Sequence, residues 1–312
     1  MLSRRLLRVK VIKGVYAHLQ CEADNITASE KSLVATIDKA YELYFHILAL
    51  APELVRYAEQ RQEIALNKML PTYEDLHPNR KFVENKVIAR IAECEAIVNF
   101  NAKHSLSWAA YPELIKAIYT ALCEEEFFKA YMASSERSWR EDARLVADIY
   151  LNLLEEFDHL ETVLEEQSLL WSDDLGYVLT MAARTVTSMK ESHEQIKLLP
   201  KFKSDEDLEF AKKLLRDSIV GYERNRDVID LYARNWDVER VAMMDNIILA
   251  VAVTEAESFP SIPVKVTLNE YIDIAKYYST PSSSTFINGV LDKITSKMLE
   301  DGKIVKSGKG LL

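Results

Sequence analysis

Basic residues gather at the start of the sequence in a pattern that suits binding to an anion. Residues 1–20 contain no acid and five basic side chains: Arg4, Arg5, Arg8, Lys10 and Lys13. Arginines in the first turn of a helix oppose the helix dipole, so they cost stability unless an anion compensates. Phosphates would compensate through paired guanidinium hydrogen bonds and release of counterions. The alternative is a solvated basic helix end without a ligand.

A second pattern with chemical meaning is Glu156-Phe-Asp-His159. Glu-x-x-His on one helix face supplies part of a di-iron carboxylate site, which needs two such pairs and two further glutamates. The sequence offers a single pair, in an acid-rich segment, so we interpret it as a surface coincidence. The sequence has no glycine-rich phosphate loop, HExxH motif or nucleophile elbow. We therefore expect no enzyme, no cofactor and no metal.

A third pattern is STPSSSTFINGVLDKI, residues 279–294, in which Ser and Thr precede the start of a helix. The first two turns of that helix carry Phe286, Asn288 and Gly289. Asn and Gly weaken a helix at such positions, which indicates a role other than stability. The Ser/Thr cluster would cap the helix, and the amides at its N-terminus favour a phosphate.

The elements that position these residues are predicted to be helices nearly end to end. Residues 7–19 repeat apolar side chains at i+4 steps. Further helices are expected over residues 31–67 with a break near Pro52, 80–100 with Val98 inward, 112–132, 138–166, 173–191, 204–235, 236–258, 263–278 and from about 285. Pro112 suits a first helical position, and Ser138 with Glu141 forms a capping-box pattern. We expect the tail, residues 301–312, to be frayed.

Glycine usage also favours an all-α fold. The 312 residues include seven glycines, and none lies between Gly14 and Gly176. Sheet proteins need residues with positive φ for their tight turns and bulges, and glycine is the usual choice there. A helical chain makes far less use of such positions.

Charge and cysteine content narrow the function classes. A net charge of −10 disfavours a protein that binds nucleic acid over its whole surface, but it allows a local basic patch. The three cysteines are scattered without a CxxC motif, which is typical of reduced thiols. No apolar run approaches the roughly 18 residues that a membrane span requires. We expect a cytoplasmic protein without a membrane partner.

The C-terminal sequence resembles the NusB family of bacterial transcription antitermination factors. The resemblance rests on IPVKVTLNEYIDIAK, FINGVLDKI and the acidic-then-apolar helix before them, and RRLLRVKVIKGVYAHLQ resembles the first helix of the family. It covers about residues 1–20 and 201–312, which would form a NusB-like RNA-binding domain. Residues 21–200 replace a short connection, as in long Bacteroidetes-type forms. The resemblance implies an all-α fold of NusB-like helical bundles with an inserted helical domain of unknown role.

The resemblance also implies a function without catalysis. Members of the family bind boxA-like single-stranded RNA together with NusE, a ribosomal small-subunit protein. In the RNA polymerase antitermination complex they promote read-through of ribosomal RNA operons. A related use, at the front of ribosomal RNA cytosine methyltransferases, is not expected because residues 1–312 contain no glycine-rich cofactor loop. The remaining alternative is a helical scaffold or metal–carboxylate protein whose insertion has replaced the RNA role.

The site residues carried over from the family lie at both ends of the chain. The RNA-binding set is Arg4, Arg5, Arg8, Lys13, Phe286 and Asn288. Phe286 would stack on an unpaired base and Asn288 would bond a base edge, the alternative being a core ring and a capping residue. Glu239 and Asp245 match the NusE-facing acids, the alternative being two solvated side chains. The insertion would cover a dimer face, bind another part of the complex or compete with RNA for the arginines, so a homodimer stays open.

Overall fold

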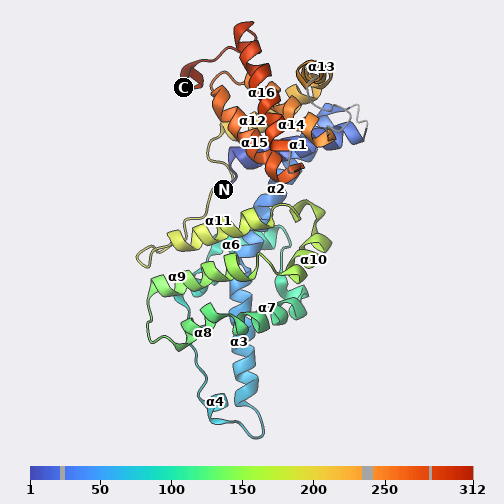
Figure 1. The fold of residues 1–312 in the computed structure, drawn as a ribbon. Coiled ribbons are helices and arrows are strands. Elements are labelled where there is room, and N and C mark those ends of the chain that lie inside the picture. Colours follow the sequence, from blue (N-terminus) through green and yellow to red (C-terminus); the bar gives the residue numbers. More distant parts are fainter. Residues whose placement is uncertain (22–24, 234–241, 281–282, 312) are drawn as a thin grey trace. The chain divides into compact units, whose positions relative to one another are not determined.

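The computed structural model describes residues 1–21, 25–233, 242–280 and 283–311, and over these ranges it contains helices and no β-strand (Figure 1). The predicted all-α fold is therefore confirmed. The chain divides into two compact units. We call residues 2–37 with 202–312 the terminal unit, and residues 38–201 with Met1 the inserted unit. Within the described ranges, no helix is long and apolar enough to cross a membrane.

The terminal unit is built around one central helix. Its helices are α1 (Arg4–Gln20), the first part of α2 (Ile26–Leu48), α12 (Glu206–Val220), α13 (Tyr222–Ala233), α14 (Met243–Ser258), α15 (Val264–Tyr278) and α16 (Ser283–Glu300). Helix α14 packs against α1, α12, α13, α15 and α16. All side chains from Ile247 to Val253 are fully buried, as expected for a helix that is apolar on every face.

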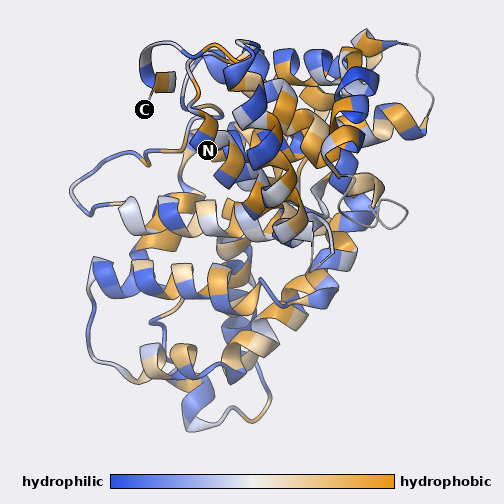
Figure 2. Ribbon diagram, turned by 45° about the horizontal axis from the view of Figure 1, so that its top comes forward, coloured by the Kyte–Doolittle hydropathy of each residue, from blue (hydrophilic) through white to orange (hydrophobic). Residues whose placement is uncertain are grey.

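The inserted unit contains the remainder of α2 and the helices from α3 to α11. These are α3 (Leu50–Leu66), α4 (Tyr73–Leu76), α5 (Lys86–Ala92), α6 (Glu95–Lys103), α7 (Pro112–Glu124), α8 (Glu126–Ala133), α9 (Trp139–Asp148), α10 (Asp158–Gln167) and α11 (Leu175–Ser188). Aromatic side chains dominate its core. The buried Tyr44 hydroxyl lies 2.7 Å from the hydroxyl of Thr185, and Tyr150 donates to the carbonyl of Leu48 at 3.3 Å. In both units hydrophobic and hydrophilic residues alternate around the helices (Figure 2).

The first unit boundary lies later than the expected residue 20, because α2 begins in the terminal unit. Leu33 and Ile37 on α2 are buried. The imidazole of His18 lies 2.8 Å from the hydroxyl of Ser29, and Arg216 forms an ion pair with Glu30 at 2.7 Å. The second boundary falls after Lys201, one residue from its expected place.

Several predicted helices are divided, and the interruptions have local causes. The expected helix over 80–100 is wrong as a single element. The Asn85 side chain accepts the amides of Val87 and Ile88 and so starts α5, while Cys94 precedes α6. Val98 is 52% exposed rather than inward. Gly221 ends α12 within the expected helix over 204–235.

One helix-start prediction is confirmed, one is confirmed in half, and two other expectations are wrong. Pro112 is the first residue of α7. The Ser138 hydroxyl accepts the Glu141 amide at 3.1 Å. The Glu141 carboxylate pairs with Lys81 at 2.9 Å instead of closing the predicted capping box. The helix that starts after Ser138 does not continue to 166, because a π-helical segment (Ile149–Leu153) and a turn separate α9 from α10. The tail is packed rather than frayed. The Lys306 ammonium donates to the carbonyls of Ala256 and Phe259.

Candidate functional site

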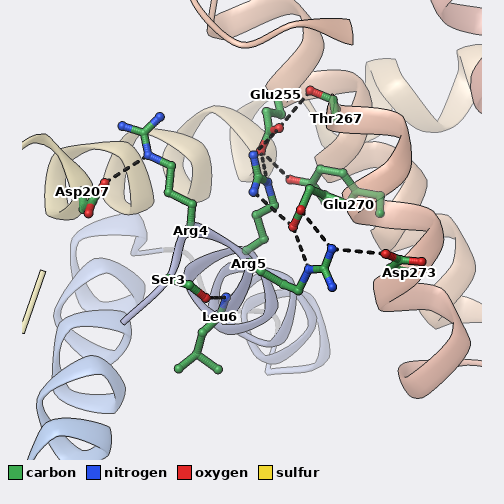
Figure 3. A network of polar contacts seen from close by, with 11 residues as sticks. Ser3, Arg4, Arg5, Leu6, Asp207, Glu255, Thr267, Glu270 and Asp273 are labelled. Carbon is green, nitrogen blue, oxygen red and sulfur yellow. Dashed lines mark hydrogen bonds and ion pairs between the residues drawn. The ribbon is translucent and has the colours of Figure 1, made fainter. Parts of the chain in front are cut away.

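The arginines of α1 meet anionic groups of the same chain. Ser3 caps the helix by accepting the Leu6 amide at 3.3 Å. Helix α1 then packs on α12 and α14. Its arginine side chains point toward carboxylates on α12, α14 and α15 (Figure 3). Carboxylates of the same chain therefore serve as anions for the arginines at this helix start.

Arg8 belongs to a buried ionic network. Its Nε and Nη2 donate to the two carboxylate oxygens of Glu255 at 2.7 and 2.9 Å, and the residues are 3% and 0% exposed. Glu255 also accepts the hydroxyls of Thr267 at 2.9 Å and Tyr271 at 3.1 Å. Burial, together with the Glu255 charge, raises the pKa of Tyr271 well above its usual value. Arg8 thus holds α1 to α14 and is closed to an external ligand in this arrangement.

Arg5 is half exposed and makes the most open contacts of the arginine group. Its Nε and Nη2 donate to Glu270 on α15 at 2.9 and 3.0 Å, and Nη2 also donates to Asp273 at 3.1 Å. The hydrogen bond with Glu270 raises the pKa of the Arg5 guanidinium. Arg4, with 38% of its side chain exposed, donates from Nε to Asp207 at 3.0 Å. Both guanidinium groups are reachable from solvent although they are paired.

Lys13 lies two turns further along α1. Its ammonium stands 4.9 Å from the centre of the Tyr278 ring, a cation–π distance. The Lys13 ammonium therefore already has a contact within the folded chain. Lys13 is partly exposed.

The two candidate residues on α16 differ in accessibility. Phe286 is 7% exposed and belongs to the hydrophobic core of the terminal unit. Asn288, two residues later, is exposed. Helix α16 begins at Ser283, and residues 281–282 fall outside the described ranges. Only Asn288 of this pair therefore presents its side chain to a ligand as the helix stands.

Of the two candidate partner-binding acids, one lies outside the described residues and the other is buried. Glu239 lies within 234–241, which the structure does not describe. Asp245 is 4% exposed and accepts hydrogen bonds from Ser279 and, at 2.7 Å, from Ser283. Its carboxylate ties α14 to the start of α16. The Ser/Thr cluster at 279–285 thus contributes to an internal bond as well as to the helix start.

The structure does not support a metal site at Glu156 and His159. Glu156 lies in the turn before α10 and His159 lies within that helix, so the two do not share a regular helical face. Both are exposed. Over the described part of the chain, no group of three or more His, Cys, Asp or Glu is placed to hold a metal ion.

The sequence reasoning missed the carboxylates that pair with the arginines: Asp207, Glu255, Glu270 and Asp273. Asp207 is 203 residues from Arg4 along the chain, and Glu270 is 265 residues from Arg5. The i, i+3 spacing of Glu270 and Asp273 shows that they share a helix face. Nothing in that spacing identifies which basic residues the face meets.

The C-terminal part of the sequence is similar to known proteins of one family. Residues 178–296 match the NusB family model. The relative named transcription antitermination protein NusB from Salinibacter ruber is 40% identical over 104 residues, covering 33% of this chain and 65% of the relative. Proteins of the same name from Chloroherpeton thalassium and Clostridium kluyveri are 36% and 38% identical, with 49% and 62% of their lengths covered. No solved structure matches this chain.

These matches leave much of this chain, and a third or more of each relative, without an aligned counterpart. The chain spans between about half and two thirds of the length of these curated relatives. Most of the inserted unit has no counterpart in the matched region, which begins at residue 178 in α11. The matched region does contain α12 to α15 and most of α16, which carry the carboxylates and Asn288. Residues 178–296 of this chain are thus similar to the NusB family.

Proposed function

We propose that this protein is a cytoplasmic, non-catalytic antitermination factor that binds boxA-like single-stranded RNA together with NusE. In this function it promotes read-through of ribosomal RNA operons as part of the RNA polymerase antitermination complex. The NusB family is a family of non-catalytic transcription factors. The observation that carries the proposal is the family match together with a helix start that presents partly open guanidinium groups.

The accessible members of the predicted set are the proposed RNA contacts. Arg4, Arg5 and Lys13 would meet phosphates, and Asn288 would bond a base edge. Arg8 and Phe286 are buried, so we assign them to positioning of α1 and α16 rather than to direct contact. This division follows from burial alone, since a side chain without exposed surface cannot touch RNA unless its helix moves.

The proposed NusE contact is less well supported by the geometry. Asp245 is occupied by two serine hydroxyls, so a partner would reach it only after those bonds opened. Glu239 stays a proposal based on the family. The inserted unit is proposed as an added interaction surface, and a homodimer remains compatible with the same assignments.

The test is RNA affinity measured by fluorescence anisotropy on the full chain. A labelled boxA-like RNA and a shuffled RNA of equal length are compared with and without NusE from the same organism. Three phosphate contacts on single-stranded RNA predict an affinity loss of about twentyfold between 50 and 200 mM salt. We expect NusE to tighten binding of the boxA-like RNA more than of the shuffled RNA.

Two matched variants distinguish RNA binding at the proposed site from a general effect of removing a positive charge. Lys13→Gln should weaken binding and flatten the salt dependence by about one phosphate contact. Lys116→Gln, which removes an exposed lysine from α7 in the inserted unit, should change neither. Absence of RNA binding at both salt concentrations, with and without NusE, would reject the proposal. The inserted unit would then be the place to look for a replaced function.

A further inference from the structure

The guanidinium of Arg5 is held by carboxylates along the edge that a phosphate would use. An arginine offers five N–H donors, and bidentate recognition uses two of them side by side. The Arg5 Nε and Nη2 groups both donate to Glu270, and Nη2 also donates to Asp273. Among the described residues, the Nη1 of Arg5 has no hydrogen-bond partner. A phosphate can therefore bind side-on at Nε and Nη2 only by displacing Glu270.

The displaced carboxylates have other partners at hand. Glu270 also lies 3.5 Å from Nη1 of Arg8, so it stays paired with a cation when Arg5 leaves. Asp273 is bonded by Lys276 at 2.8 Å through its other oxygen, and this bond holds the pKa of Asp273 below its usual value. Neither carboxylate is left unpaired by the exchange. The free-energy cost of opening is thereby limited to the contacts with Arg5.

Exposure allows the exchange to occur in solution. The side chains of Arg5, Glu270 and Asp273 are 50%, 21% and 37% exposed. Ion pairs at this degree of exposure are worth little because water and salt screen them. The pair of Arg8 with Glu255, at 4% and 0% side-chain exposure, is of the opposite kind and stays closed. The network thus combines a fixed inner pair with an outer clasp that an anion can open.

We infer that Glu270 and Asp273 act as an anionic clasp that competes with RNA phosphate for Arg5 and so lowers the RNA affinity of the free protein. The inference rests on the proposed RNA-binding function and adds a regulating element to it. Within the network, the charges of Arg5, Arg8 and Lys276 are balanced by Glu255, Glu270 and Asp273. A phosphate that enters without displacing a carboxylate meets a neutral cluster, which gives it little electrostatic attraction.

The clasp predicts that removal of either negative charge tightens RNA binding. Glu270→Gln and Asp273→Asn keep the shape of each side chain. Each is expected to raise the affinity for boxA-like single-stranded RNA by about two- to fivefold at low salt, the range expected for an exposed ion pair. The gain should shrink as salt rises. Arg5→Gln should weaken binding, and adding Glu270→Gln to Arg5→Gln should bring no further gain of this kind.

The matched control is Glu300→Gln on α16. Glu300 is an exposed acid that pairs with a lysine three residues away, as Asp273 does. An equal gain in Glu300→Gln would show a general charge effect and overturn the clasp. A gain from Glu270→Gln that persists without Arg5 would overturn it as well. Circular dichroism of every variant verifies that the helices are intact.

The outcomes distinguish the clasp from the function on which it rests. RNA binding by the unmodified chain with no gain in Glu270→Gln or Asp273→Asn would refute the clasp and leave the RNA function standing. Absence of RNA binding in the unmodified chain and in every variant would refute both. Binding that becomes measurable only in the Glu270→Gln or Asp273→Asn variant would support both.

Discussion

The buried pair of Arg8 and Glu255 gives the most decisive prediction about α1. Replacing Arg8 by Met removes two charge-assisted hydrogen bonds, at 2.7 and 2.9 Å, and leaves the Glu255 carboxylate with the hydroxyls of Thr267 and Tyr271. Glu255 is 0% exposed, so its charge has no access to water. Loss of one partner of such a pair costs about 3–5 kcal/mol in the free energy of unfolding.

The companion variants show whether the charges act as a pair. Glu255→Gln leaves Arg8 with Glu270 at 3.5 Å, so we expect a smaller loss of about 2 kcal/mol. The double variant, Arg8→Met with Glu255→Gln, removes both charges together. Its loss should be at least about 1 kcal/mol smaller than the sum of the single losses.

The assay has to report on the terminal unit alone. Three of the four tryptophans lie in the inserted unit, so fluorescence would mainly follow that unit. Amide hydrogen exchange measured by mass spectrometry on peptides from α14 and α15 reports opening of the terminal unit. Peptides from α9 in the inserted unit serve as the internal control. A loss below about 1 kcal/mol in Arg8→Met, or strictly additive losses in the double variant, would refute the pairing argument.

Three further predictions concern other parts of the chain. His46 is fully buried, and burial lowers its pKa to about 4 from 6.5. Between pH 6.5 and 4, His46 is protonated in the unfolded chain but stays neutral in the folded chain. The free energy of unfolding of the inserted unit should therefore fall by about 3 kcal/mol from pH 6.5 to 4, and His46→Leu should flatten this loss in urea titrations followed by tryptophan fluorescence. In Gly310→Ala the new Cβ would lie 1.9 Å from the Pro260 carbonyl oxygen, so the tail should detach and trypsin should cleave it at least about fivefold faster. Asp245→Ala leaves the Ser279 hydroxyl without this acceptor and should cost about 1–3 kcal/mol in hydrogen exchange of α15 and α16, whereas unchanged exchange would return Asp245 to the role of a free partner-binding acid.

Local patterns made much of the helical content predictable. Apolar repeats at i+3 and i+4 predicted most helices of the terminal unit, and Pro112 and Ser138 marked two helix starts that the structure confirms. These signals act over three or four residues, so the sequence contains them in full. The breaks at Asn85 and Gly221 have local causes of the same kind. They were missed because the apolar repeat continues through both positions.

The sequence determined that arginines at the start of α1 need an anion, but only the tertiary structure decided which anions stand nearest. The partners of Arg4, Arg5 and Arg8 are more than 200 residues away along the chain. Helix periodicity gives the face on which a charge lies and not the helix that the face meets. For the same reason the sequence could not decide between a base-stacking and a core position for Phe286, and it gave no sign that Asp245 is buried. Packing around α14 divides the predicted RNA-binding residues into two groups. Arg8 and Phe286 are buried, and Arg4, Arg5, Lys13 and Asn288 are at least partly exposed.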